Sequence, residues 1–431
     1  MIPWLLALHI DTLKSQILMY GLAAIVLAYL SARRPWRSLL LRSAAPFIFG
    51  IVVGLIVVWL VSDVVDVFGV SMSLIVRMWV ALAFGGVAVA LANLWKVRWW
   101  RKVIAIASIP VFLASAAVGI NIDFGAYRTL NDALGIDPYS ALPAELQTSS
   151  AGTMNPTLGK TWRAPSDLPA RGDVKSVLIP GTLSHFPARA AVVYLPPAAL
   201  VARPPVLPVL IMFSGQPGDP SGLFTSGHIA EILDAYAARH GGLAPIVVAP
   251  DQLGFASKNP MCIDSSMGNV ETYVTVDVVN WVRSHLLVSD SGRYWAVGGY
   301  SEGGTCSIQF GAGHPELFGT IVDILGEKQP TIGSDTVSKV FGGSSSAYDA
   351  IKPMTLLDHH APYSDSMAFF GAGQREAKYN KYAHEMRAAA QAAGMATKLI
   401  VSPNSGHDWN TVRYVFSRAL PDLMARLGLG S

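Results

Sequence analysis

Four long apolar runs near the N-terminus constrain most strongly what this chain can fold into. They cover approximately residues 15–32, 44–62, 72–95 and 103–121 of the 431-residue chain. A helix needs about 20 apolar residues to cross the hydrocarbon core of a bilayer, and each run is close to that length. We therefore predict a four-helix transmembrane anchor over residues 1–121. This anchor also explains a composition that is 52% hydrophobic and only 14% charged.

The charges between these runs predict how the helices are oriented. The basic residues that follow the first and third runs are Arg33, Arg34, Arg37, Arg42, Lys96, Arg98, Arg101 and Lys102, and the acidic residues between the second and third runs are Asp63 and Asp66. Basic connections stay on the cytoplasmic side, which places everything after residue 121 outside the cytoplasm. The net charge of +3 comes mostly from these connections, so it gives no reason to expect a nucleic-acid partner.

Two features of the anchor leave alternatives open. Arg77 lies inside the third run, where an arginine usually snorkels or packs against a partner and less often has a function of its own. The first run has the length of a signal peptide, but no small-residue cleavage site follows it. We expect the first helix to remain attached to the chain.

The rest of the chain has a different pattern. Residues 122–172 are rich in Pro, Ser, Thr and Gly, as in a membrane-proximal connector. Over residues 173–431, short buried-type strands alternate with segments of helical spacing, which predicts a mostly parallel sheet with helices on both faces. Strands are expected at 174–180, 188–197, 205–215, 244–252, 293–300, 320–325, 365–373 and 397–403, and helices at 227–239, 270–287, 302–313, 378–394 and from Trp409.

A pentapeptide of the form G-x-S-x-G, from Gly299 to Gly303, joins one of these strands to a helix. Glycine is common in the chain, so the pentapeptide alone is weak evidence. Its context is stronger, because a serine between a strand and a helix can stand on a sharp turn that exposes its hydroxyl. We predict that Ser301 is a nucleophile.

A serine nucleophile needs a base and a group that orients the base. His407 lies in a short loop that follows a late strand, which would place it at the same edge of the sheet as Ser301. It is our candidate base. The rivals are His359 and His360, which we expect in a loop, whereas His314 before Pro315 is more typical of a helix end.

The candidate acid is Glu376, which follows the strand over residues 365–373 and precedes a helix. This order of serine, acid and histidine is that of the α/β-hydrolases. Asp365 and Asp408 are substitutes, and a surface role as a helix cap is the alternative for Glu376. The turn Ser214–Gly218 after an earlier strand offers one oxyanion donor, so we expect the backbone amides of Gln216 and Glu302 to form the oxyanion hole.

The chain has two cysteines, Cys262 and Cys306, both in the segment expected outside the cytoplasm. In an oxidising compartment they could form a disulfide beside the nucleophile helix, and two buried free thiols are the alternative. No histidine and cysteine pattern indicates a metal site, and we expect no cofactor.

At these residues the chain resembles the esterase D-like branch of the α/β-hydrolases, which includes the secreted mycolyltransferases. The resemblance covers about residues 174–427 and rests on GYSEGGTCSIQFGAGHPELFG, SGQPG, FFGAGQREAKY and NSGHDW. It implies an α/β-hydrolase fold with nucleophile, acid and base at Ser301, Glu376 and His407. Two positions depart from the family pattern: Glu302 stands where Met or another apolar residue is common, and the turn after Phe213 lacks the usual L-x-D-G-x.

The expected function is a membrane-anchored serine esterase that acts outside the cytoplasm on carboxylic esters of membrane or envelope lipids. An acylated glycolipid and an aminoacylated phospholipid are the candidate substrates, the second because its amino group could meet Glu302. An acyltransferase would use the same acyl-enzyme. A catalytically inactive binding module is the alternative from a different class.

Overall fold

The computed structural model describes residues 3–32, 40–67, 69–95, 97–136, 138–147 and 150–430. Its contacts divide the chain into two compact units, Met1–Ile136 and Asp137–Ser431. The basic residues Arg33, Arg34, Arg37 and Lys96, on which the predicted orientation partly depends, lie outside the described residues. Two expectations stay predictions. One is the connector over residues 122–172, and the other is that the basic loops lie on the cytoplasmic side of the membrane.

The first unit is helical, as expected. Within the described residues, four of its helices are long and apolar enough to cross a membrane, at Leu13–Ser31, Ala45–Val64, Leu74–Ala92 and Trp99–Phe124, with hydropathies from 1.6 to 2.5. Its elements are α1 (Pro3–Leu6), α2 (Leu13–Ser31), η1 (Leu40–Ala44), α4 (Ala45–Trp59), η2 (Leu60–Val64), α5 (Leu74–Ala92), α6 (Trp99–Phe124) and α7 (Leu130–Ala133).

Small residues let the helices α4 and α5 approach closely. A Cβ atom on Gly50 would lie 2.4 Å from the carbonyl oxygen of Phe84, and one on Gly54 would lie 2.9 Å from the Cα atom of Ala81. Because lipid is as apolar as the side chains, such close van der Waals packing is what holds membrane helices together. The bundle is therefore built as a packed unit.

Arg77 on α5 is paired with Asp63 on η2. Its Nη1 and Nη2 atoms lie 2.7 and 2.8 Å from the two carboxylate oxygens of Asp63, and its Nε donates to the carbonyl of Met72 at 2.9 Å. A two-point contact of this kind is the strong form of the arginine–carboxylate interaction. Of the alternatives for Arg77, the structure shows the packed one.

The second unit is built on an eight-stranded sheet, counted over the described residues, with the order β1-β2-β4-β3-β7-β8-β9-β10. The pairs β1–β2 and β2–β4 are antiparallel, and the others are parallel. The strands are β1 (Asp173–Val177), β2 (Ala191–Leu195), β3 (Val209–Phe213), β4 (Ile246–Ala249), β7 (Trp295–Tyr300), β8 (Thr320–Ile324), β9 (Met367–Gly373) and β10 (Ala396–Ser402), and a separate hairpin pairs β5 (Asp264–Ser265) with β6 (Gly268–Asn269).

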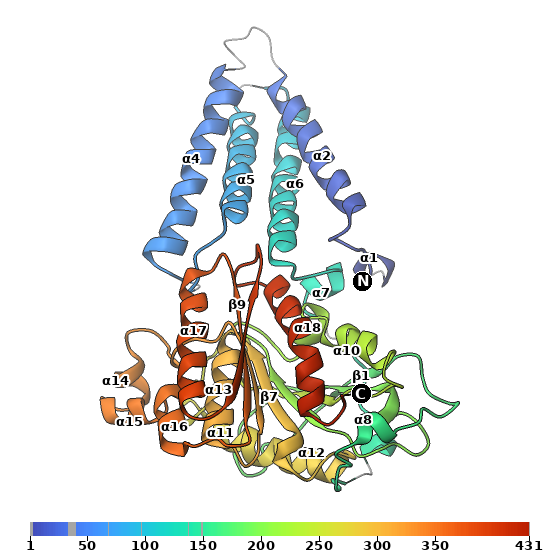
Figure 1. Ribbon diagram of the computed structural model, residues 1–431. Helices are drawn as coiled ribbons and strands as arrows, with labels where there is room; N and C mark the ends of the chain where they lie inside the picture. The colour runs from blue at the N-terminus through green and yellow to red at the C-terminus, as the bar shows by residue number, and fades with distance from the viewer. Residues whose placement is uncertain are drawn as a thin grey trace. The chain divides into compact units, whose positions relative to one another are not determined.

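Helices cover both faces of this sheet. In Figure 1, α13, α16 and α17 lie on one side of the strands, and α10 and α18 lie on the other. The helical elements are η3 (Ala144–Gln147), α8 (Leu158–Thr161), η4 (Pro197–Ala199), α9 (Gly222–Thr225), α10 (Ile229–Ala237), α11 (Val270–Thr272), η5 (Tyr273–Val278), α12 (Val279–His285), η6 (Gly292–Tyr294), α13 (Glu302–Gly313), α14 (Thr336–Val340), α15 (Ser345–Ala350), α16 (Pro353–His360), α17 (Ala377–Ala392) and α18 (Trp409–Arg426). The predicted α/β-hydrolase architecture is confirmed.

Most predicted elements lie within a few residues of the observed ones, and one prediction is wrong. His359 and His360 were expected in a loop, but they form the last turn of α16 (Pro353–His360). Proline at the first helical position starts this helix, because its fixed φ suits the first turn and its missing N–H is not needed there. The rivals to His407 are therefore helical residues.

The two cysteines form a disulfide. Cys306 lies in the second turn of α13, and its sulfur is bonded to Cys262, 44 residues earlier in the chain. Both residues are only 1% exposed. The bridge joins the segment after β4 to the helix that begins next to Ser301. The structure therefore shows the disulfide and not the two free thiols that were the alternative.

We expect the disulfide to stabilise the second unit by restricting its unfolded state. Closing a loop of 44 residues is worth about 4 kcal/mol in the chain-entropy description. The double variant Cys262→Ala/Cys306→Ala should unfold at clearly lower denaturant concentration than the oxidised protein. Chemical unfolding with and without reductant measures this, and the variant should show no further loss when reductant is added. Equal stability of variant and oxidised protein would contradict the prediction.

Candidate active site

Ser301 stands on a sharp turn between β7 and α13. Its backbone angles are φ 59° and ψ −119°, a left-handed conformation that a residue with a Cβ atom rarely adopts. Two glycines allow the turn: a Cβ atom on Gly299 would lie 2.1 Å from the carbonyl oxygen of Gly303, and one on Gly303 would lie 2.4 Å from that of Ser214. The Ser301 amide donates to the carbonyl of Ile324 at 2.9 Å, which fixes the turn to β8.

His407 meets Ser301 at the carboxyl edge of the sheet. Its Nε2 atom lies 2.8 Å from the Oγ atom of Ser301, although 106 positions separate the two residues in the chain. The loop after β10 (Ala396–Ser402) carries the histidine, and β7 carries the serine. A base at this distance can accept the hydroxyl proton, which is the geometry that a serine nucleophile needs.

Two tyrosines hold the imidazole of His407 in place. The Tyr300 hydroxyl donates to the carbonyl of His407 at 3.1 Å. The ring centroids of Tyr300 and Tyr379 lie 5.2 and 4.3 Å from that of His407. Sequence reasoning did not single out either tyrosine, although Tyr300 lies inside the pentapeptide. Nothing in the local sequence of Tyr379 indicates its contact with the histidine.

Glu376 lies at the same edge, next to the loop of His407. The amides of Gln374 and Arg375 donate to the carbonyls of Ser402 and Ser405 at 2.9 Å each, so the segment that precedes Glu376 is joined to the segment that precedes His407. Glu376 is 8% exposed and is the N-cap residue of α17. The Nδ1 atom of His407 is buried and has no hydrogen-bond partner among the described residues. The structure thus brings Glu376 to the site without a bond to the imidazole.

The two substitutes for the acid are used elsewhere. Asp408 caps α18, where its carboxylate accepts from the amides of Thr411 at 3.0 Å and Gly406 at 2.7 Å. Asp365 forms ion pairs with Arg293 and Arg426. Both carboxylates therefore have other partners, and Glu376, whose segment is bonded to the loop of His407, stays the candidate acid.

The imidazole of His407 is held in its neutral form. Burial, and to a lesser extent the positive charge of Lys378, together lower its pKa to about 3. A neutral imidazole is the form that accepts a proton. His407, the candidate base, should therefore stay able to accept a proton well below neutral pH.

The turn expected to supply an oxyanion donor packs directly against Ser301, the predicted nucleophile. A Cβ atom on Gly215 would lie 3.1 Å from the Cβ atom of Ser301. The side chain of Gln216 points away to the carbonyl of Ser257, to which its Nε2 donates at 2.9 Å. Only the backbone of Gln216 is thus available to the site, as the prediction requires. The role of its amide and that of Glu302 as oxyanion donors stays a prediction.

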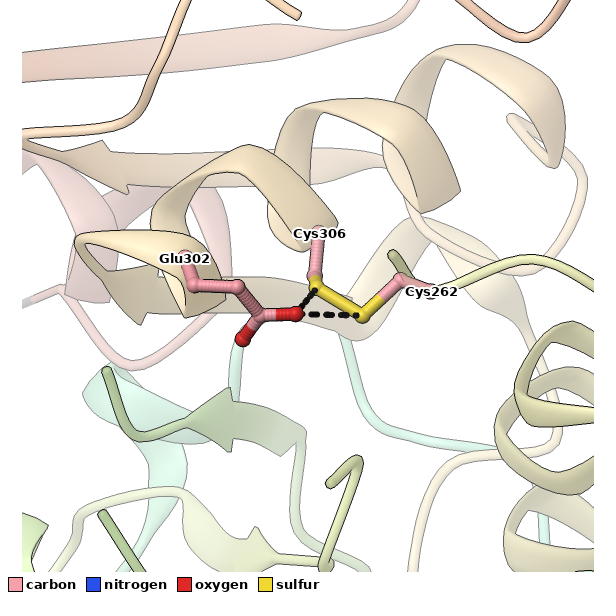
Figure 2. Close-up of side chains that lie close together, drawn as sticks. All are labelled: Cys262, Glu302 and Cys306. Atoms are coloured by element: carbon pink, nitrogen blue, oxygen red, sulfur yellow. Dashed lines mark hydrogen bonds between the residues drawn. A yellow bond between two sulfur atoms is a disulfide. The ribbon is translucent and has the colours of Figure 1, made fainter. Parts of the chain in front are cut away.

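The side chain of Glu302 is buried in the protein. Its Oε2 atom accepts from Nε2 of Gln252 at 2.9 Å, and its Oε1 atom lies 3.1 Å from the sulfur of Cys306 (Figure 2). The pKa of Glu302 is raised to about 8: burial is the largest cause, the bond from Gln252 acts in the opposite direction, and the charges of Glu327 and Asp251 add to the rise. Glu302, Cys262 and Cys306 are as close together as metal ligands would be, but the disulfide uses both sulfurs.

Comparison with known proteins identifies the family. The esterase family (Esterase) matches residues 188–423. The chain belongs to this family. It is accordingly a serine ester hydrolase, of the esterase D-like kind that its motifs resemble. The uncharacterized protein Cgl0967/cg1104 of Corynebacterium glutamicum is 30% identical over 364 residues, which cover 81% of this chain and 83% of that protein.

Solved structures of two hydrolases are similar to this chain. A ferulic acid esterase superimposes with a TM-score of 0.50 at 18% identity, covering 59% of this chain and 98% of its own. An S-formylglutathione hydrolase from Agrobacterium tumefaciens is 17% identical with a TM-score of 0.49, covering 60% of this chain and 97% of its own. The first of these likenesses shows the α/β-hydrolase fold and nothing finer.

We expect Gly299→Ala to disrupt the turn at Ser301. The new methyl group would lie 2.1 Å from the Gly303 carbonyl, and a displacement of the nucleophile by about 1 Å can reduce turnover about 100-fold. The measurement is hydrolysis of a soluble p-nitrophenyl ester. Gly313→Ala, at the other end of α13, is the matched control because its Cβ atom would meet nothing closer than 3.9 Å. Equal activity of the two variants would contradict the prediction that the turn at Ser301 requires glycine at position 299.

Because the pKa of His407 is lowered, we predict that kcat/KM does not fall on the acid side of its pH profile until well below neutral pH. Because the imidazole charges only near pH 3, kcat/KM for a soluble ester should stay level from pH 7 to about 5. Lys378→Gln removes a charge that lowers this pKa, so its acid limb should move to higher pH. Lys381→Gln, which removes a lysine that pairs with Glu385 on the same helix, should leave the limb in place. A wild-type limb near pH 6.5 would refute this assignment.

Proposed function

We propose that this protein is a membrane-anchored serine esterase that cleaves carboxylic esters of membrane or envelope lipids outside the cytoplasm, with Ser301, His407 and Glu376 as its triad. The observation that carries the proposal is the 2.8 Å contact between His407 Nε2 and Ser301 Oγ on a strained turn at the carboxyl edge of the sheet. Strain of this kind is retained where the surrounding structure maintains it, and it is concentrated at functional sites.

In the proposed reaction, His407 takes the hydroxyl proton of Ser301 as its oxygen attacks the ester carbonyl. The amides of Gln216 and Glu302 stabilise the negative oxygen of the tetrahedral intermediate. The imidazolium then returns the proton to the leaving alcohol, and an acyl-enzyme remains. Water attacks this ester with His407 again as base, which releases the acid and restores the serine.

Glu376 orients the imidazole and stabilises its charged form during this cycle. In the structure the Nδ1 atom of His407 has no hydrogen-bond partner among the described residues, while Glu376 is held at the adjoining loop by the bonds from Gln374 and Arg375. Catalytic hydrogen bonds often tighten only when substrate is bound. We infer that the carboxylate of Glu376 turns to Nδ1 as the positive charge develops.

The substrate class follows from the N-terminal unit. Four helices that can cross a membrane would keep the hydrolase unit at the lipid surface, where amphiphilic esters are concentrated. An acylated glycolipid fits this setting. The case for an aminoacylated phospholipid is weaker than the sequence indicated, because the Glu302 carboxyl is buried against Gln252 and the disulfide. A substrate amino group would not reach it.

We expect Ser301→Ala and His407→Ala to abolish labelling by a fluorophosphonate probe and to lower ester turnover at least about 1,000-fold. Glu376→Gln should lower kcat strongly and keep the protein folded, whereas Asp408→Ala should mainly lower the melting temperature because it removes a helix cap. Mass spectrometry of membrane lipids incubated with full-length protein should show loss of acylated species with the wild type only.

Each outcome of this experiment assigns a function. A new acylated acceptor in place of free fatty acid would identify an acyltransferase that uses the same acyl-enzyme. Absence of labelling and of turnover by the wild type would refute the esterase and favour a binding module. Unchanged lipids with active ester turnover would refute the lipid substrate alone.

A further inference from the structure

The side chain of Gln252 bridges the two segments that are proposed to carry the oxyanion donors. It lies just after β4 (Ile246–Ala249) and is fully buried. Its Nε2 atom donates to the carbonyl oxygen of Ser214 at 2.7 Å and to the Oε2 atom of Glu302 at 2.9 Å. Ser214 begins the turn that contains Gln216, and Glu302 follows the nucleophile. One amide group therefore spans both halves of the proposed oxyanion hole.

The orientation of this amide is fixed by its neighbours. A flipped amide would place its oxygen against the Ser214 carbonyl and the Glu302 carboxyl, and both of those atoms are acceptors. In the observed orientation the Oε1 atom of Gln252 is buried and has no hydrogen-bond partner among the described residues. A buried acceptor without a partner costs free energy. The orientation that leaves Oε1 of Gln252 without a partner is thus the one that keeps both hydrogen bonds from its Nε2.

The other oxygen of Glu302 faces the disulfide. Its Oε1 atom lies 3.1 Å from the sulfur of Cys306 and 3.5 Å from that of Cys262 (Figure 2). Bridged sulfurs carry no proton and cannot donate, so an ionised carboxylate would have no hydrogen-bond donor on this side. A protonated carboxyl can donate its own O–H to a sulfur. The surroundings of Glu302 thus suit the neutral acid.

We propose that Glu302 and Gln252 form a positioning pair that fixes the spacing of the two oxyanion segments, and that the uncharged carboxyl of Glu302 is the form that supports turnover. This inference rests on the proposed esterase function. It assigns no contact with substrate to either side chain, since both act through the backbone of Ser214 and Glu302. The proposal also assigns a role to Glu302, which stands where the family commonly has an apolar residue.

The charges around Glu302 set the pH at which this pair would fail. The pKa of Glu302 is raised to about 8, mainly by burial. The hydrogen bond from Gln252 lowers it, and the charges of Glu327 after β8 and Asp251 after β4 raise it. Asp251 is itself paired with Arg189, and the two disulfide sulfurs do not titrate. Above pH 8 the carboxyl would carry a negative charge one residue from Ser301, where the reaction also develops negative charge.

The test measures kcat and KM for p-nitrophenyl butyrate from pH 6 to 10 with full-length protein in detergent. Wild-type kcat should fall about tenfold between pH 7 and 9, as expected when only the protonated form of a group of pKa near 8 is active. Glu302→Gln has no carboxyl to ionise, so its kcat should lose this alkaline fall. Gln252→Leu should lower kcat at pH 7 about tenfold and leave KM within about twofold, less than the loss of an oxyanion donor itself.

Gln309→Leu is the matched control for Gln252→Leu. Gln309 also has a buried side-chain amide whose oxygen has no partner among the described residues. Together with Glu302 and Cys306 it lines a small cavity. It bridges no oxyanion segment, so its variant should keep the wild-type kcat and pH profile. Melting temperatures of all variants separate a folding defect from a loss of positioning.

The outcomes separate this inference from the function on which it rests. Wild-type protein that neither hydrolyses the ester nor is labelled by a fluorophosphonate at Ser301 would refute the esterase and the positioning pair together. Active wild type with an unchanged alkaline fall in Glu302→Gln, or with full kcat in Gln252→Leu, would overturn the pair alone. If Gln252→Leu does not fold, the pH profile of Glu302→Gln still decides the question.

Discussion

The left-handed backbone of Ser301 is the constraint on which the catalytic unit depends. A residue with a Cβ atom at φ 59° carries about 1 to 3 kcal/mol of strain and keeps this conformation only where its surroundings enforce it. The surroundings here are a buried strand before the serine, a buried helix after it and a backbone bond from its amide to β8. Gly299 and Gly303 are required because the chain passes too close to itself for side chains at either position.

A parallel sheet makes the rest of the site possible. The carboxyl ends of β3, β7, β9 and β10 lie at one edge, so the four segments of the proposed site follow strands that end together: the turn at Ser214, Ser301, Glu376 and His407. Short backbone bonds then join neighbouring loops, such as that from Arg375 to Ser405. The site is thus assembled from four segments that are distant in the chain, and each is positioned by a rigid strand.

The buried carboxyl at Glu302 illustrates how a departure from a family pattern is accommodated. An apolar side chain at this position would need only space, whereas an acid needs partners or a proton. Gln252 supplies one hydrogen bond, burial favours the protonated form, and the disulfide forms the remaining wall. Together these contributions make a polar residue compatible with the interior.

The sequence by itself determined the apolar helices, the alternation of strands and helices, and the candidates Ser301 and His407. These follow from local periodicity and from chain order along a parallel sheet, both of which can be read without coordinates. The helix expected at 302–313 begins and ends at Glu302 and Gly313, because the turn before it and the glycines around it are local signals. The helical turn at His359 and His360 was misjudged, since the short segment has no strong apolar period.

Only the tertiary structure decided which distant groups meet. Sequence spacing could not show that Cys262 is bonded to Cys306, that Gln252 reaches Ser214 and Glu302, or that Tyr379 lies against His407. It also could not show that the side chain of Glu302 is directed into the protein, against Gln252 and the disulfide. Contacts of this kind depend on how the loops pack against one another, and sequence periodicity does not predict loop packing. Burial is the main cause of the shifted pKa values of Glu302 and His407, and it exists only once the chain has folded.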